Sequence, residues 1–193
     1  MTPRPYPESN RLAAALDRCL ALAAAWEDEV CRTSRLKYAT VKKLTDGAGA
    51  KRWGGRWNPP GVAAVYCSLD AETALAEMRQ RHRHGGVPLR KMMPRLFVAM
   101  RVRLRQVLDL TQRKARRILA VSVDRLCEEW QDGDVEPITQ AIGRLAWERA
   151  FDGLLVPSVP ARAQHGINLV VFPDRAPADW GAILNKDELA EGE

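Results

Sequence analysis

A stretch of strict alternation, from Leu96 to Arg105, constrains the fold more than any other feature of the sequence. Apolar side chains stand at every second position, and the positions between them include three arginines. A period of two is typical of a β-strand that turns one face to a core and the other to water. We therefore expect a β-sheet with one solvated side.

Shorter patterns on both sides of this strand predict helices and further strands. Apolar residues recur at helical spacing from about Ser9 to Glu27, behind a proline-rich leader. The other predicted strands are 30–34, 62–68, 153–156 and 167–172, and the other predicted helices are 68 or 70 to 83, 111–120, 122–130 and 137–150. The turn-rich segment 45–61 is expected to be a loop.

This mixture predicts a single α+β domain whose mixed or antiparallel sheet is flanked by helices. The length of 193 residues favours one domain, and the sequence contains neither internal repeats nor a domain linker. We divide the chain into a leader and helix (1–27), a central domain (28–175) and an acidic C-terminal tail (176–193).

Composition excludes several classes of protein. No apolar run approaches the roughly 20 residues needed to cross a bilayer, so we do not expect a membrane protein. The three histidines show no metal-ligand spacing, and no C-x-x-C pair occurs among the four cysteines. Scattered thiols are typical of core residues in a reducing cytoplasm, so we expect no metal and a cytoplasmic location. These cysteines are Cys19, Cys31, Cys67 and Cys127.

Charge is distributed unevenly along the chain. The net charge is +6, but residues 79–117 hold thirteen Lys and Arg residues against one acid, Asp109, a local balance of +12. Such a stretch attracts phosphates or an acidic protein, or it forms a solvated face. Nucleic acid is not expected as a partner, because Phe97 is the only Phe, Tyr or Trp in this stretch on which a base could stack.

The segment from Arg52 to Gly61 (R-W-G-G-R-W-N-P-P-G) places two tryptophans, two arginines and an asparagine in a Gly/Pro-rich loop. Glycine lets a backbone approach a ligand closely, and an arginine fork binds phosphate or carboxylate. The alternative is a loop that Trp53 and Trp57 anchor to the core. The segment alone leaves both interpretations open.

A carboxylate follows the next predicted strand. Glu77 lies four residues after Thr73 on a predicted helix, so it can point inward, whereas Glu72 in the first turn suits solvent and the helix dipole. An inward carboxylate near Tyr66 and the arginine-containing loop forms a candidate site. The alternative is one surface glutamate among many.

These segments, taken in order, resemble the RES-domain family, the toxins of Xre–RES toxin–antitoxin systems. The resemblance covers about residues 30–173, and it rests on G-G-R-W-N-P-P-G at 54–61, Tyr66-x-Ser68, Ala74-x-x-Glu77, Leu155-Val156-Pro157-Ser158 and Asn168. It implies a fold related to ADP-ribosyltransferases and an enzyme that consumes NAD+ by phosphorolysis, by hydrolysis or by transfer of ADP-ribose to a protein.

The resemblance also implies roles for individual residues. Catalytic roles fall to Glu77, Tyr66 and Ser158, and substrate binding falls to Arg32, Arg56, Asn58 and Ser68. The family often places an aromatic residue after its first arginine. Thr33 stands there in this chain and Arg35 lies close by, so the first arginine of the family pattern is Arg32 or Arg35.

These residue types suit the cleavage of NAD+, which expels neutral nicotinamide and leaves a cationic ribose. A carboxylate such as Glu77 stabilises that cation and binds ribose hydroxyls. Tyr66 can stack on the nicotinamide ring, and arginines can hold the pyrophosphate. No G-x-G-x-x-G motif occurs, which fits NAD+ as a substrate rather than a recycled cofactor, with inorganic phosphate as the co-substrate of a phosphorolysis.

Partners and other functions follow as expectations. The resemblance implies a helix-turn-helix (Xre-like) antitoxin, and the N-terminal helix serves either as a homodimer interface or as a cover for the sheet. A hydrolase with Ser158 as nucleophile and His165 as base is a second catalytic candidate, although the G-x-S-x-G elbow is absent. The non-catalytic alternative is a basic module that binds an acidic protein or nucleic acid.

Overall fold

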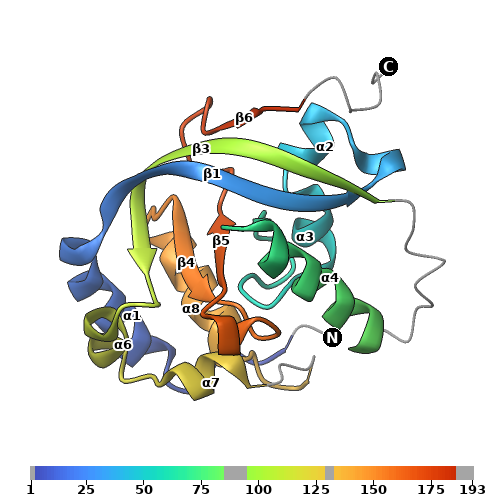
Figure 1. Cartoon of the computed structure of the whole chain (residues 1–193). Coiled ribbons are helices and arrows are strands. Elements are labelled where there is room, and N and C mark those ends of the chain that lie inside the picture. The colour runs from blue at the N-terminus through green and yellow to red at the C-terminus, as the bar shows by residue number, and fades with distance from the viewer. Residues whose placement is uncertain (1–2, 85–94, 129–132, 186–193) are drawn as a thin grey trace.

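Two long strands form a curved antiparallel ribbon across the molecule (Figure 1). The structure, a computed structural model, describes residues 3–84, 95–128 and 133–185. Strands β1 (Ala24–Arg35) and β3 (Arg95–Asp109) pair along almost their whole length. The short strand β6 (Gly181–Ile183) pairs with β3 as well.

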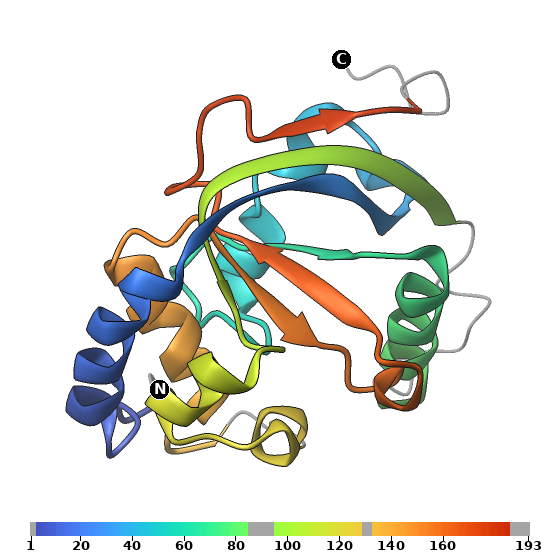
Figure 2. The same cartoon turned by 60° about the vertical axis from the view of Figure 1, so that its left-hand side comes forward.

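A second layer lies under this ribbon and consists of β2 (Val65–Ser68), β5 (Ile167–Val171) and β4 (Gly153–Pro157), paired antiparallel in that order. β4 joins the end of β3 in parallel, and β2 meets β1 where Ser68 pairs with Cys31. The strands β1, β2, β5, β4 and β3 therefore form a closed ring of pairings, and Figure 2 shows the ribbon arching over the other three.

Side chains alternate between the two faces of the β2–β5–β4 layer. One set packs under the ribbon: Val65, Cys67, Leu155, Leu169 and Val171, against Val98, Met100, Val102 and Leu104. The other set packs against helices: Leu154, Val156 and Val170, with Leu12, Leu16, Leu119 and Ile142. Both faces of this layer are thus covered, which leaves its polar residues to gather at the strand ends.

Helices cover the sheet on two sides (Figure 1). α1 (Ser9–Cys19), α6 (Arg113–Leu119) and α8 (Ile138–Glu148) pack on the face that the ribbon leaves open. α4 (Ala71–His84) packs against β1 and β2. The shorter helices are α2 (Val41–Thr45), α3 (Ala48–Trp53) and α7 (Val123–Cys127). This is the expected single domain with a sheet core and flanking helices.

Three predictions from the sequence are confirmed. In β3, the apolar positions 98, 100, 102 and 104 are buried and the arginines 101, 103 and 105 are exposed. Asp70 rather than Ser68 caps α4, because its Oδ1 accepts a hydrogen bond of 2.6 Å from the Thr73 amide. Pro137 stands directly before α8.

The extent predicted for the N-terminal helix is wrong. α1 ends at Cys19, a 3₁₀ turn covers Leu20–Leu22, and residues 24–27 already belong to β1. Trp26, counted as helical from its spacing, pairs with Leu104 of β3. The pairing partner lies far along the chain, so a local helical period could not reveal it, and the strand predicted at 30–34 is longer for the same reason.

Two other segments also differ from expectation. The predicted loop 45–61 contains the helix α3, which lies between Gly47 and Gly54, both of them at positive φ (63° and 72°). The strand β6 lies within 176–193, the segment that the sequence analysis separated as an acidic tail, and is too short to leave a periodic pattern. The predicted helix end near Trp130 and residues 186–193 lie outside the described residues.

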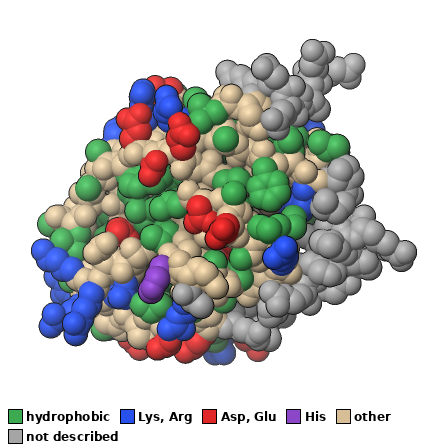
Figure 3. All heavy atoms as spheres, in the orientation of Figure 1, with side chains coloured by type: hydrophobic (Ala, Val, Ile, Leu, Met, Phe, Trp, Pro, Cys, Tyr) green, Lys and Arg blue, Asp and Glu red, His purple; other side chains and the backbone are tan. Residues whose placement is uncertain are grey.

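Within the described residues, the basic stretch does not form one face. Arg101 and Arg103 are in ion pairs with Glu29 and Glu27 across the ribbon. The exposed basic residues of α6 lie elsewhere, and Figure 3 shows Lys and Arg side chains gathered in the region where Figure 1 places α1 and α6. The exposed basic residues of α6 are Arg113, Lys114 and Arg117.

In the described part of the chain, no helix is both long and apolar enough to span a membrane.

Candidate active site

Polar side chains gather where β2, β5 and β4 lie side by side. Ser68 pairs with Asn168, and Asn168 pairs with Val156, two residues before Ser158. Because side chains alternate along a strand, this register brings the three polar residues to the helix-covered face of the layer. Ser68 and Asn168 are in direct contact, since the Ser68 hydroxyl donates to Asn168 Oδ1 over 2.8 Å.

Glu77 of α4 completes this polar cluster. Its Oε1 accepts one hydrogen bond from the Ser158 hydroxyl (2.8 Å) and one from the Asn168 amide (2.6 Å). Among the described residues no donor reaches its Oε2, and the side chain is half-buried. The carboxylate is thus held by one oxygen while the other is available to a ligand hydroxyl or a developing positive charge.

Ser158 is fully buried at the start of a tight loop after β4. Its amide donates to the Gly166 carbonyl (2.8 Å), and its hydroxyl also accepts from the Ala161 amide. That hydroxyl donates to Glu77 and makes no hydrogen bond with His165 among the described contacts. The serine-hydrolase alternative therefore lacks its base in this structure.

Tyr66 lies on β2 and faces the Gly/Pro-rich loop. Its hydroxyl donates to Asn58 Oδ1 (2.7 Å) and accepts from the Trp57 amide (2.9 Å). The half-buried ring packs against the helix-side core. The loop thus fixes the hydroxyl of Tyr66, while the backbone of Tyr66 is held in the sheet.

Asn58 supports the loop from inside. It is fully buried, and its Nδ2 donates to the carbonyls of Ala50 and Val62 at 2.9 and 2.8 Å. Trp57 is 2% exposed, whereas Trp53 is 71% exposed. The loop is therefore anchored by Trp57 and Asn58, and the anchoring role considered for Trp53 is wrong.

The two arginines that the sequence analysis assigned to substrate binding lie on different sides of Tyr66. Arg32 of β1 donates to the Tyr66 carbonyl (3.2 Å), and its charge acts to lower the pKa of the neighbouring Cys67 thiol. Arg35, the other candidate for the first position, lies at the far end of β1 opposite Arg95. Arg32 is the one that reaches β2.

Arg56 extends from the loop toward α7. Its Nη1 donates to the carbonyls of Leu126 (3.2 Å) and Glu128 (2.8 Å). The charges of Arg56 and Glu77 both act on the Cys127 thiol, whose pKa is raised chiefly by burial, so the end of α7 lies near both groups. The hydrogen bonds from Arg56 Nη1 thus tie the Gly/Pro-rich loop to the end of α7.

Comparison with known proteins decides the family. The RES domain matches residues 29–189, most of this chain. This chain belongs to the RES-domain family. The polar cluster at the strand ends is thus part of a RES domain, and the relation to ADP-ribosyltransferases stays a prediction.

Relatives of this RES domain include the NAD(+) phosphorylase MbcT of Mycobacterium bovis and of Mycobacterium tuberculosis, each 31% identical over 129 residues. The match covers 65% of this chain and 63% of MbcT, slightly under two thirds of the length of either protein. A chain in the crystal structure of the M. tuberculosis MbcT–MbcA toxin–antitoxin complex shares the fold, with a TM-score of 0.71 and 24% identity over 91% of this chain and 90% of that one.

The RES domain site also contains residues that sequence reasoning did not assign. Gln140 of α8 donates to the Gly55 carbonyl, and Arg162 forms an ion pair with Asp124 of α7. For Gln140, the signal in the sequence was a glutamine among the apolar residues of a predicted helix. No local pattern could have revealed the ion pair, since it joins α7 to the 3₁₀ turn Arg162–Gln164, far along the chain.

In the described part of the RES domain, no group of three His, Cys, Asp or Glu side chains could hold a metal ion. Its four cysteines are free thiols, and burial raises the pKa of each. Burial raises the pKa of the Cys67 thiol to about 11, against the lowering effect of Arg32. The thiols of this domain therefore stay protonated at neutral pH.

Cys67 is expected to make stability fall at high pH. The thiol of the unfolded chain loses its proton near pH 9, whereas the folded thiol keeps it until about pH 11. Between these values the unfolded state binds fewer protons, so the free energy of unfolding decreases as pH rises, by about 2–3 kcal/mol in all from this group. Denaturant unfolding at pH 8 to 11 should show a shallower decline in Cys67→Ala than in the parent. An equally steep decline in both would contradict the assignment.

Proposed function

We propose that this RES domain cleaves the bond between nicotinamide and ribose in NAD+, with inorganic phosphate as the acceptor. The observation that carries the proposal is the Glu77 carboxylate, oriented through one oxygen by Ser158 and Asn168. The name of the MbcT relatives supports phosphate over water or a protein side chain as the acceptor.

Cleavage breaks the bond from ribose C1″ to the pyridinium nitrogen, and the bonding electrons leave with nicotinamide. The positive charge moves from the pyridinium ring to the ribose as the bond breaks. Glu77 supplies the opposite charge where that charge develops, which lowers the barrier more than it strengthens ground-state binding. A phosphate oxygen then forms the new bond to C1″, which gives ADP-ribose 1″-phosphate.

Other residues of the site hold the substrate. The half-buried ring of Tyr66 can stack on the cationic nicotinamide, and Arg32 and Arg56 carry the positive charge that a pyrophosphate needs. Ser68 is buried and orients Asn168. The side chain of Asn58 bonds the loop carbonyls and the Tyr66 hydroxyl. Its role in substrate binding is therefore to position Tyr66, without touching the substrate.

The test is to incubate the protein with NAD+, with and without inorganic phosphate, and to separate the products by chromatography. Nicotinamide and ADP-ribose 1″-phosphate should form only when phosphate is present. Equal nicotinamide release without phosphate would show hydrolysis instead. Intact NAD+ in both samples would favour the alternative of a non-catalytic basic module.

Arg56→Lys is expected to weaken NAD+ binding about tenfold although the net charge is unchanged. The guanidinium donates through Nη1 to the Leu126 and Glu128 carbonyls, and its planar shape matches the oxygens of a phosphate. A lysine has one nitrogen and cannot reproduce this planar geometry. Arg52→Lys, an exposed change in the same segment, is the control and should bind like the parent. Parental affinity in Arg56→Lys would make this arginine purely structural.

We also propose that a helix-turn-helix antitoxin binds this chain and blocks the site in the cytoplasm. The shared fold with a chain of the MbcT–MbcA toxin–antitoxin complex supports a protein partner, and the four free thiols fit a reducing compartment. The exposed basic residues of α6 would steer an acidic partner. Association with the antitoxin should then slow as salt is added, and a salt-independent association rate would exclude this steering. A homodimer of this chain would appear as a molecular mass that falls when the protein alone is diluted.

A further inference from the structure

We propose that Gln140 is a positioning residue for this reaction, which fixes the Gly/Pro-rich loop and, through it, the hydroxyl of Tyr66. The inference rests on the proposed function and adds a residue to its machinery. Gln140 lies on α8, far in sequence from the loop and from Tyr66, and it is 2% exposed.

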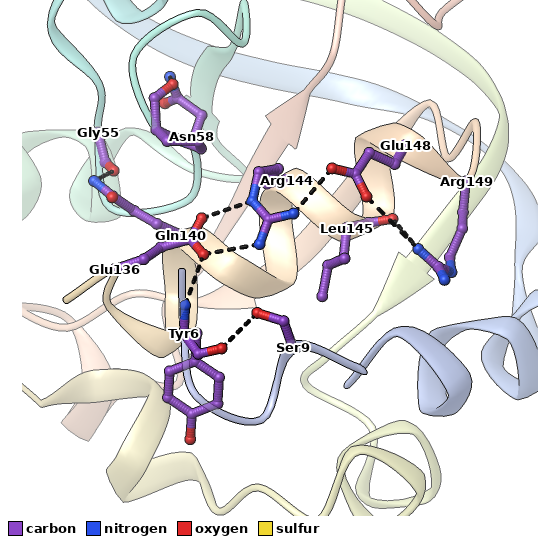
Figure 4. A network of polar contacts seen from close by, with 11 residues as sticks. Tyr6, Ser9, Gly55, Asn58, Glu136, Gln140, Arg144, Leu145, Glu148 and Arg149 are labelled. Carbon is purple, nitrogen blue, oxygen red and sulfur yellow. Dashed lines mark hydrogen bonds and ion pairs between the residues drawn. The ribbon is translucent and has the colours of Figure 1, made fainter. Parts of the chain in front are cut away.

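The first contact joins α8 to the loop. Gln140 Nε2 donates to the Gly55 carbonyl over 2.9 Å, as Figure 4 shows. Gly55 is itself one end of a tight turn, because its amide donates to the Asn58 carbonyl over 2.8 Å. Because Gly55 and Asn58 are bonded to each other, the hydrogen bond from Gln140 to Gly55 restrains both ends of the turn.

The second contact joins the loop to Tyr66. Within the same turn, Asn58 and the Trp57 amide bind the Tyr66 hydroxyl at 2.7 and 2.9 Å. A Cβ at Gly55 would lie only 2.6 Å from that hydroxyl oxygen, so the turn backbone and the tyrosine are in close contact. A shift of Gly55 would displace the hydroxyl with it.

The helix that carries the glutamine is itself fixed. Gly143, one turn further along, lets the helix backbone approach the Trp57 carbonyl. Arg144 binds both oxygens of the buried Glu136 at 2.8 Å, and Glu136 also accepts from the Tyr6 amide (Figure 4). α8 therefore offers Gln140 a rigid base, which a positioning residue requires.

The chemistry of the position also favours a positioning role. A buried amide costs desolvation, and its hydrogen bond to a carbonyl returns only a modest net gain in stability. An apolar residue of the same length would pack in such a site with less cost. What the amide adds is a directed donor, and small displacements of a reacting group can lower a rate severely.

The experiment is a double-mutant cycle on kcat/KM for NAD+ in phosphate buffer. Gln140→Met keeps the length of the side chain and removes the donor, and we expect a loss of roughly tenfold or more. Tyr66→Phe removes the hydroxyl. If Gln140 acts through that hydroxyl, the double variant should be little worse than Tyr66→Phe alone. Losses that multiply, or a parental kcat/KM in Gln140→Met, would overturn the proposal.

Two controls separate this role from general destabilisation. Thr139→Val changes the preceding residue of the helix, which is equally buried and whose hydroxyl has no partner among the described residues. This variant should keep the kcat/KM of the parent. Gln140→Ala serves if the methionine variant fails to fold. Amide exchange at Trp57 gives a readout without substrate and should accelerate in Gln140→Met. If the parent leaves NAD+ intact, the proposed function fails, and unchanged exchange at Trp57 would separately refute the positioning.

Discussion

Glu77→Gln is expected to lower NAD+ turnover by about 10²–10³ while NAD+ affinity stays close to that of the parent. The glutamine oxygen can still accept from Ser158 and Asn168, so the local hydrogen bonds and the fold should persist. What disappears is the negative charge beside the ribose as it becomes cationic. The loss should therefore appear in kcat, measured as NAD+ consumed per enzyme.

The control for this variant lies on the same helix. Glu72 stands in the first turn of α4 and is exposed, so Glu72→Gln removes the same charge from the same element and should turn over NAD+ like the parent. Thermal melting of both variants checks the fold. Parental activity in Glu77→Gln would place the catalytic carboxylate elsewhere, and unfolding of that variant alone would make Glu77 a packing residue.

Gly143→Ala is expected to destabilise the fold by about 3 kcal/mol or more. A Cβ at position 143 would lie 1.7 Å from the carbonyl oxygen of Trp57, which is backbone and cannot rotate away. Either α8 or the loop must move. Denaturant unfolding measures the loss directly.

Gly49→Ala is the matched control. This glycine lies in α3 with nothing within 4 Å of its virtual Cβ and is exposed, so alanine should stabilise the chain by about 0.5–1 kcal/mol. Opposite signs for the same substitution would locate the cost at 143 in the contact with Trp57. A small effect at 143 would mean that the loop yields easily, and the rigid base inferred for Gln140 would then be lost as well.

The parts of the fold that the sequence predicted are those whose signal is local. β3 alternates strictly, and the Asp70 cap precedes its helix by one residue. The start of β1 was missed because the pairing of Trp26 with Leu104 depends on a strand far along the chain. Local periodicity carries no information on such a partner.

The site divides in the same way. Glu77 could be predicted to point inward from its spacing, and the ordered motifs named Ser158, whose hydroxyl donates to it. The register that puts Ser68 and Asn168 on one face exists only once β2 and β5 pair. Gln140 was missed because its contact with Gly55 crosses 85 positions of sequence and needs the packed helix to exist.

The closed ring of strands has a consequence for synthesis of the protein. β1 needs β3, β2 needs β5, and the Glu77 carboxylate needs Asn168, 91 residues later. Contacts of such long range form slowly, and a chain still on the ribosome cannot make them until the distant residues emerge. An unfinished chain therefore carries the carboxylate without its donors, and the polar cluster can form only after residue 168 has left the ribosome.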